Sequence, residues 1–228
     1  PDPEHMTELQ RRLDALAGRM RQGIRSGLEG IRRLDEACGA PSQRLRAVVV
    51  AGTNGKGTCC RALEAIARAH GLRTGLFSSP HRSRFNQLFL IDGQAVDYST
   101  VLRWLDAVDH EDYTFFGVST AMAFYGFAEA ELDLAILEVG MGGRLDAVNL
   151  VDGVASAVVS ISRDHEAFLG SDLYQIAGEK LGVSRPGRPL VLGPGMTPYL
   201  EQAEATDATV SLNGRDWRSD QRTVNTSS

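Results

Sequence analysis

Cysteine, aromatic residues and long apolar runs are all scarce in this sequence. The chain has 228 residues and three cysteines, Cys38, Cys59 and Cys60. An odd number with two adjacent excludes a disulfide framework and the usual spacing of a zinc site, so we expect reduced thiols and a cytoplasmic location. The sequence has no run of about 18 apolar residues, so it predicts no membrane-spanning helix, and no secretory signal pattern opens it.

An excess of positive charge is also missing. The net charge of −5 and the pI near 5.6 argue against nucleic acid or an anionic membrane surface as a partner. The hydrophobic share of 43% and the charged share of 23% are those of an ordinary globular protein. Such a length suits one large domain, or a domain and a half. We expect residues 1–5 to be an expression remnant, residues 6–216 to form the folded part, and residues 217–228 to be a polar tail.

Short apolar runs alternate with amphipathic segments along the chain. The sequence predicts a hairpin around Asp92 and Gly93, and no clear element from residue 209 onward. Strands are predicted at 47–51, 73–77, 134–139, 155–161 and 189–192, and helices over 7–38 (broken by glycines), 59–70, 100–108, 118–130 and 173–180. Strands that alternate with helices indicate an α/β fold, with a mostly parallel sheet flanked by helices on both faces.

A glycine-rich turn, AGTNGKGTCC at residues 51–60, joins the first predicted strand to the next helix. The strict phosphate-loop pattern is Gly, four residues, Gly-Lys, then Ser or Thr. Here Val50 stands at the first position, and Gly57 separates Lys56 from Thr58. The place between strand and helix still suits polyphosphate, which backbone N–H groups and the helix dipole can hold.

We therefore expect this turn to bind a nucleotide, with Lys56 at the β- and γ-phosphates and Thr58 at Mg²⁺. The alternative is a strand-to-helix turn without a ligand. The expected nucleotide-binding residues are Gly52, Thr53, Asn54, Gly55, Lys56, Gly57 and Thr58.

Polar residues follow other predicted strands at the ends where open α/β sheets bind ligands. Glu138 closes LAILE and offers oxygen ligands to Mg²⁺, or is an ordinary strand-end charge. A lone histidine such as His165 is more often structural, but its place at the same sheet edge favours a ligand role. The segment SSPHRSRFN, residues 78–86, either binds an anionic or polar substrate or is a solvated loop. Glu179 and Lys180 have the pattern of surface charges.

Five motifs occur in one order between about Gly23 and Asp216: GTNGKGT, GLFSSPHRSRFN, EVGMGGRLDAVN, DHEAFLG and EKLGVSRPG. Through them the sequence resembles the folylpolyglutamate synthase/dihydrofolate synthase branch of the Mur ligase family. In that family the loop lysine is also followed by Gly and then by the hydroxyl residue. The resemblance implies a P-loop NTPase-like ATP-binding domain over residues 6–216. It also implies a ligase that uses ATP and Mg²⁺ to join L-glutamate to dihydropteroate or folate through an acyl phosphate.

The resemblance also implies roles for single residues. Lys56 would neutralise the β- and γ-phosphates, Thr58 and Glu138 would hold a first Mg²⁺, and His165 a second. Lys180 matches a lysine that is carbamylated in the family and then organises metal. The residues that match the loop associated with the pterin substrate are Ser78, Ser79, Pro80 and His81.

Two substitutions and the length depart from the family pattern. Gln87 and Gly117 stand where the family usually has acidic residues, which bears on substrate choice more than on ATP. Family members carry about as much chain again, including the rest of the ATPase sheet and a C-terminal Rossmann-like domain. Three interpretations stay open: part of a folate ligase, impaired without that domain or a partner chain; a non-catalytic module that binds nucleotide or a partner; and an amide ligase for another acid.

Overall fold

The computed structural model describes residues 3–19, 28–79, 84–108, 113–163 and 172–218. Its helices and strands in chain order are α1 (Pro3–Arg19), α2 (Leu28–Ala37), η2 (Pro41–Arg44), β1 (Ala47–Ala51), α3 (Lys56–Ala69), β2 (Thr74–Phe77), η3 (Phe85–Leu88), β3 (Phe89–Ile91), β4 (Gln94–Ala95), α4 (Tyr98–Val108), α5 (Phe115–Glu129), β5 (Leu134–Glu138), η4 (Ala147–Leu150), β6 (Ala155–Val158), α7 (Leu173–Leu181), β7 (Pro189–Leu192), η5 (Thr197–Tyr199), α8 (Leu200–Glu204) and β8 (Thr209–Leu212).

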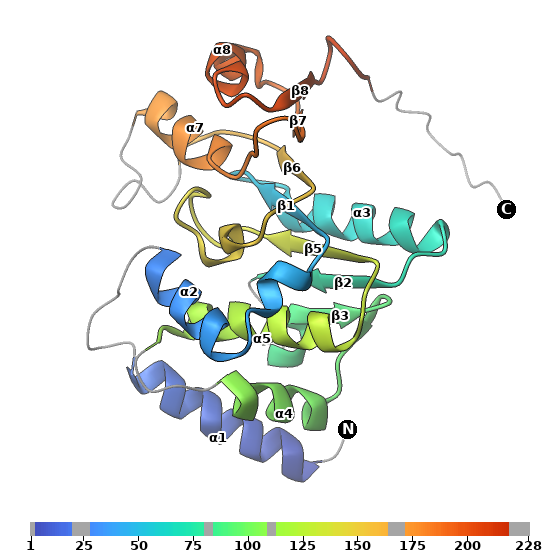
Figure 1. Ribbon diagram of the computed structural model, residues 1–228, viewed down its shortest axis with the longest axis vertical. Helices are drawn as coiled ribbons and strands as arrows, with labels where there is room; N and C mark the ends of the chain where they lie inside the picture. Colours follow the sequence, from blue (N-terminus) through green and yellow to red (C-terminus); the bar gives the residue numbers. More distant parts are fainter. Residues whose placement is uncertain (1–2, 20–27, 80–83, 109–112, 164–171, 219–228) are drawn as a thin grey trace, which may run out of the picture.

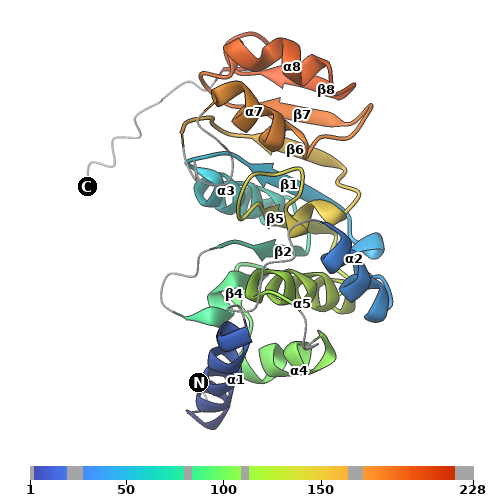
Figure 2. The ribbon, with the colours of Figure 1, turned by 90° about the vertical axis from the view of Figure 1, so that its left-hand side faces the viewer.

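An eight-stranded sheet in the order β4-β3-β2-β5-β1-β6-β7-β8 runs through the molecule. Strands β2, β5, β1, β6, β7 and β8 pair in parallel, whereas β3 and β4 extend the edge beyond β2 as antiparallel strands. Figure 2 shows this stack of strands from β8 at the top to β4 near the bottom. The predicted α/β fold with a mostly parallel sheet is confirmed, and so is the hairpin around Asp92 and Gly93.

The central strands are apolar on both sides because helices cover both faces of the sheet. Successive residues of one strand enter different cores: Val49 and Leu137 join the larger core, and Val50 and Ile136 join the smaller one. Helix α3 covers the smaller core with Cys60, and α5 contributes to the larger one. In Figure 1, α3 (cyan) lies across the sheet from α7 (orange).

The structure corrects several predicted boundaries. Helix α3 begins at Lys56, three residues earlier than predicted, so the lysine of the glycine-rich turn lies in its first turn. Strand β6 ends at Val158, short of the predicted residue 161. The prediction of no element from residue 209 onward is wrong, because TVSL forms β8. Its polar Thr209 and Ser211 give no strong strand pattern, and pairing with β7 makes it a strand.

Helix α8 was not predicted from the sequence. Among the described helices, none combines the length and the apolar character that crossing a bilayer requires. The expression remnant at residues 1–5 and the polar tail at 217–228 stay predictions, and both lie partly outside the described residues.

Helix α5 packs so closely on α4 that one of its positions has no room for a side chain. A Cβ added at Gly126 would lie 2.3 Å from Trp104 Cε2. The indole of Trp104 is fully buried, and its Nε1 donates a hydrogen bond to Glu129 Oε2 at 3.1 Å. The indole is buried and its Nε1 is tied to the same helix, so it has little room to move away from an added methyl group.

Replacement of Gly126 by Ala should destabilise the fold. We expect Gly126→Ala to lower the free energy of unfolding by about 1–3 kcal/mol, as overpacked cores do, measured by urea unfolding. Gly30→Ala is the matched control, since Gly30 is also helical and an added Cβ would meet, within the described parts of the chain, only Tyr113 Cε1, at 4.0 Å. That change should stabilise the protein by up to about 1 kcal/mol through helix propensity. Equal effects of the two substitutions would contradict the packing described above.

Candidate phosphate and metal site

The candidate site lies at the carboxyl end of β1, in the middle of the parallel sheet. Strand β1 is flanked by β5 and β6, and the chain passes from β5 across β1 to β6. Val50 is paired with Glu138, and Ala51 with Val158, so the three strands end at one level. Ligands of open α/β sheets bind at such a switch of strand order.

The glycine-rich turn is tied to the segment that follows β6. Thr53 N donates to Ser160 O at 3.0 Å, and Thr53 Oγ1 donates to Ser162 O at 3.1 Å. Asn54 N donates to Ser160 Oγ at 2.9 Å, and this hydroxyl donates in turn to Asn54 O. No role was predicted for Ser160 from the sequence, although a hydroxyl residue just after a strand at this edge is a usable signal. These bonds fix the turn in one conformation.

Two glycines make the turn possible. Gly52 has φ 148°, and a Cβ there would lie 2.4 Å from Val159 Cγ2. Gly55 has φ 83° and directly precedes α3, with no side chain capping the start of the helix. A Cβ at Gly55 would have no neighbour within 4 Å among the described residues. The first N–H groups of α3 thus remain available to an anion.

The ammonium group of Lys56 lies over the turn itself. Lys56 Nζ donates to Gly52 O at 3.0 Å and to Thr53 O at 3.1 Å. The side chain therefore curls back over residues 52–53 and holds its positive charge at the mouth of the turn. Phosphate oxygens could replace these carbonyl partners, because charged acceptors make stronger hydrogen bonds.

A buried carboxylate lies beside the turn. Glu138 is only 4% exposed, and Ser78 Oγ donates a hydrogen bond to its Oε2. A Cβ at Gly57 would lie 3.4 Å from that oxygen. Burial raises the pKa of Glu138, while the hydrogen bond from Ser78 and the charge of Lys56 act in the opposite direction.

These residues fit Mg²⁺, which prefers carboxylate, hydroxyl and phosphate oxygens. Glu138 and Ser78 present such oxygens beside Gly57, and Thr58, the next residue along the chain, is exposed. A divalent cation would also compensate the cost of burying the Glu138 charge. Among the described residues, no three His, Cys, Asp or Glu side chains cluster to hold a metal alone. Phosphate or water oxygens would have to complete the coordination.

Not every predicted site residue can be placed. His165, Pro80 and His81 lie outside the described residues. Ser79 lies next to the site, because its backbone N–H is hydrogen-bonded to Glu138. Ser78, predicted to contact substrate, has its hydroxyl on Glu138.

Lys180 is buried in the last turn of α7, with 3% exposure, so the surface-charge alternative is wrong for this residue. The loop that follows Glu138 packs on this turn: a Cβ at Gly143 would lie 3.1 Å from Lys180 Cα. Glu179 does lie nearer the surface and accepts hydrogen bonds from the guanidinium of Arg144. The pattern of two adjacent charges could not distinguish the inward from the outward side chain.

A second buried carboxylate closes this loop. Asp146 accepts hydrogen bonds from Gly140 N at 3.0 Å, Met141 N at 2.9 Å and Val148 N at 3.0 Å. Burial raises its pKa to about 6, against the opposing effects of these three N–H groups and Lys56. No role was predicted for Asp146 from the sequence. The available signal was an Asp directly before a short helix, where its side chain can cap backbone N–H groups.

The raised pKa of Asp146 predicts a pH dependence of stability. The folded-state pKa of about 6 exceeds the ordinary value of 3.8, so between these values the folded protein binds more protons than the unfolded chain. The stabilising contribution of the proton is complete below about pH 4 and is lost as the pH rises through about 6, at about 1.4 kcal/mol per pKa unit.

Asp146→Asn removes this titration. We therefore expect the stability difference, wild type minus Asp146→Asn, to fall between pH 4.5 and pH 7, measured by urea unfolding at a series of pH values. A difference that stays constant or grows with pH would show that Asp146 has no raised pKa in the folded state.

Comparison with known proteins identifies relatives of the chain. A dihydrofolate synthase/folylpolyglutamate synthase of Haemophilus influenzae is 42% identical over 183 residues, which are 78% of this chain and 42% of that protein. The structure of E. coli FolC in complex with DHPP and ADP matches 92% of this chain and 52% of its own, with TM-score 0.85 and 35% identity. No protein-family model matches the chain.

A third relative is a bifunctional folylpolyglutamate synthase/dihydrofolate synthase with Mn, AMPPNP and L-glutamate bound. Its structure matches 95% of this chain and 53% of its own, with TM-score 0.82 and 35% identity. The chain thus spans about half the length of the relatives it matches. The resemblance seen in the motifs is confirmed: this chain is a homologue of the dihydrofolate synthase/folylpolyglutamate synthase enzymes, matched over about half of their length.

Proposed function

We propose that this chain provides the nucleotide and metal site of an ATP-dependent ligase that joins L-glutamate to a dihydropteroate or folate carboxylate. The observation that carries the proposal is the meeting of Lys56, Gly57 and Glu138 at the carboxyl edge of the sheet. Homology to synthases of this name supports the substrate class. The net negative charge of the chain suits an enzyme that binds neither nucleic acid nor membrane. Its three cysteines, which have no disulfide or zinc spacing, suit a cytoplasmic location.

The residues of the turn act by positioning charge, which is the main task of a protein in phosphoryl transfer. The first N–H groups of α3, which no side chain caps, hold the phosphates of ATP. Lys56 releases the carbonyls of Gly52 and Thr53 and donates to phosphate oxygens. Bound Mg²⁺ supplies further charge neutralisation, and the residues that would hold it are Thr58, Glu138 and Ser78, with His165 as the ligand proposed for a second ion.

The chemistry that we propose has two steps. A substrate carboxylate oxygen attacks the γ-phosphorus of ATP, the bond to ADP breaks, and an acyl phosphate forms. The amine of L-glutamate then attacks the acyl carbon, and phosphate leaves as the amide bond forms. Ser79, Pro80 and His81 are the proposed substrate contacts, and Lys180 is proposed to organise metal. One related structure holds DHPP and ADP, and another holds Mn, AMPPNP and L-glutamate, which agrees with this set of ligands.

One observation favours a second candidate, an amide ligase for a different acid. Gly117, where an acidic residue was expected, lies in the first turn of α5, and its N–H is bonded to Thr114 Oγ1 at 3.1 Å. The neighbouring Phe116 reaches the loop after β5, since a Cβ at Gly140 would lie 2.7 Å from its ring. This side of the site therefore presents an aromatic ring and no carboxylate from residue 117. Screening carboxylic acids for ATP-dependent glutamylation distinguishes the two candidates.

Loss of the Lys56 ammonium group should weaken nucleotide binding. Lys56→Ala should lower the affinity for a non-hydrolysable ATP analogue with Mg²⁺ by at least about tenfold, because a hydrogen bond to a charged group contributes about 1.5–3 kcal/mol. Isothermal titration calorimetry measures this change. Arg32→Ala is the matched control, since it removes an exposed cation from α2. Equal affinity of wild type and Lys56→Ala would refute the phosphate site.

Ligation by the isolated chain is expected to be weak or absent, because the chain spans about half of its relatives. Mass spectrometry of reactions with Mg²⁺, ATP, L-glutamate and either dihydropteroate or tetrahydrofolate detects the product. The Haemophilus influenzae relative serves as the positive control. Turnover comparable to that relative would show that this chain alone holds a complete ligase site.

A further inference from the structure

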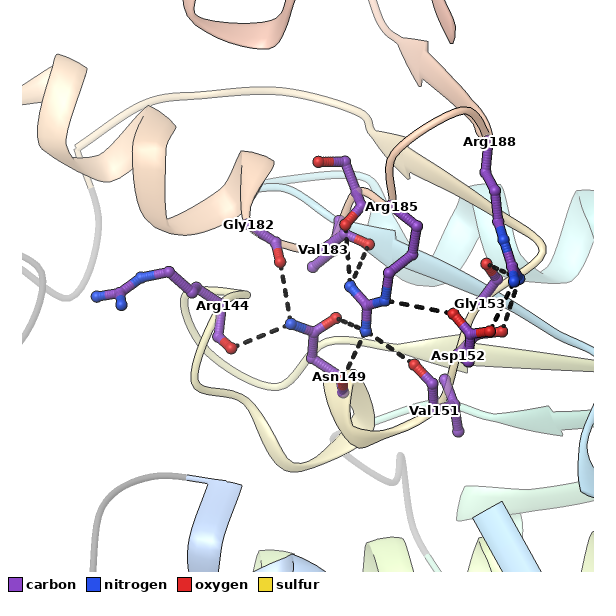
Figure 3. Close-up of polar contacts among 10 residues, drawn as sticks. Arg144, Asn149, Val151, Asp152, Gly153, Gly182, Val183, Arg185 and Arg188 are labelled. Carbon is purple, nitrogen blue, oxygen red and sulfur yellow. Dashed lines mark hydrogen bonds and ion pairs between the residues drawn. The ribbon is translucent and has the colours of Figure 1, made fainter. Parts of the chain in front are cut away.

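The loop that follows β5 is joined to the end of α7 by one asparagine. We call residues 140–149 the site loop, because it begins two residues after Glu138. Asn149, at 5% exposure, donates from Nδ2 to Arg144 O and to Gly182 O, both at 3.0 Å. One acceptor lies within the site loop and the other directly after α7. Figure 3 shows the amide between these two carbonyl groups.

The other end of this amide is held by Arg185. Its Nη2 donates to Asn149 Oδ1 at 3.1 Å, to Asn149 O at 2.8 Å and to Val151 O at 2.8 Å. Its Nη1 donates to Val183 O and Ser184 O, at 3.2 and 3.0 Å. One guanidinium thus binds carbonyl groups on both sides of the junction (Figure 3). Asn149 uses both its amide oxygen and its amide nitrogen.

The two segments touch backbone to backbone beneath these side chains. Arg144 N donates to Glu179 O at 2.7 Å. A Cβ at Gly182 would lie 2.4 Å from Arg144 Cβ, and one at Gly143 would lie 2.6 Å from Glu179 O. Lys180 belongs to the turn that makes these contacts. The site loop is therefore in direct backbone contact with the turn that carries Lys180.

We infer that Asn149 and Arg185 are positioning residues that fix the last turn of α7, with Lys180, relative to the strand end that carries Glu138. This inference rests on the proposed function, in which Glu138 and Lys180 belong to the metal and phosphate site. Groups that orient metal-binding residues without touching metal affect the metal affinity strongly. A buried amide with all its partners in place is suited to this role, because each lost bond leaves a buried carbonyl unsatisfied.

A neighbouring arginine provides the matched control. Arg188 Nη1 donates to Asp152 O at 3.0 Å and to Gly153 O at 2.8 Å, and Nη2 bonds to Asp152 Oδ2 at 2.6 Å. It joins the start of β7 to residues 152–153, which lie beyond the site loop. Arg188→Gln therefore removes an arginine with three such bonds, against five for Arg185, and leaves the hydrogen bonds at Asn149 in place. Both arginines also form an ion pair with Asp152.

Hydrogen exchange of the chain without ligand tests the junction directly. The variants Asn149→Ala and Arg185→Gln should increase amide exchange in both the site loop and residues 178–184, whereas Arg188→Gln should not. Arg185→Lys, which keeps the charge and part of the reach, should restore part of the protection lost in Arg185→Gln. Unchanged exchange in residues 178–184 of both Asn149→Ala and Arg185→Gln would overturn the inference, whether or not the chain binds nucleotide.

Mn²⁺ binding to the complex with a non-hydrolysable ATP analogue tests the positioning role, with electron paramagnetic resonance as the readout. We expect Asn149→Ala to weaken Mn²⁺ affinity by about 10–100-fold, with little change in metal-free nucleotide affinity, and Arg188→Gln to match wild type. If Asn149→Ala does not fold, Asn149→Asp replaces it, since it keeps the acceptor for Arg185 and loses both donors.

The outcomes separate the two proposals. Wild-type Mn²⁺ affinity in a folded Asn149 variant would overturn the positioning role and leave the proposed function standing. Absence of nucleotide binding by the wild type would overturn the proposed function and the metal-site role together, and hydrogen exchange would still decide whether Asn149 and Arg185 couple the two segments.

Discussion

The parallel pairing of β1 with β5 and β6 is the constraint on which the site depends. Parallel strands end at one edge, and the register that pairs Val50 with Glu138 brings the glycine-rich turn beside that carboxylate. The same arrangement places Ser160 within reach of Thr53 and Asn54. If the register moved by one residue, each side chain of the strand would point to the opposite face. Such a shift would also turn the Glu138 side chain away from the glycine-rich turn.

Burial of charge gives the site its chemical character. Glu138 and Asp146 are both carboxylates with a pKa raised by burial, but they have different surroundings. Asp146 is surrounded by backbone N–H groups and closes a loop. Glu138 has a hydroxyl partner, and a Cβ at Gly57 would lie 3.4 Å from its Oε2. A cation bound beside Glu138 would offset the cost of desolvating this carboxylate.

Much of the fold follows from local pattern. Buried parallel strands are short continuous apolar runs, and the run 47–51 was placed without error because each of its side chains belongs to a core. Strand β8 has no such pattern, since an edge strand is stabilised by one neighbour and its polar residues face outward. The glycine-rich turn was found from its place between strand and helix. Asn149 and Arg185 were not, because their partners are backbone carbonyl groups, which have no signature in sequence.

The sequence by itself determined most strands and helices as far as β7, the turn at residues 51–60 and the resemblance to folate ligases, because these depend on periodicity, glycine and motif spacing. The tertiary structure alone decided which charged side chains are buried and what they touch. Glu179 and Lys180 are adjacent in sequence, yet one pairs with Arg144 and the other is enclosed in the last turn of α7. Which side chain of a helix points inward is decided only when the sheet has assembled. The same holds for contacts between segments far apart in sequence, such as the one between Arg144 and Glu179, which are 35 residues apart.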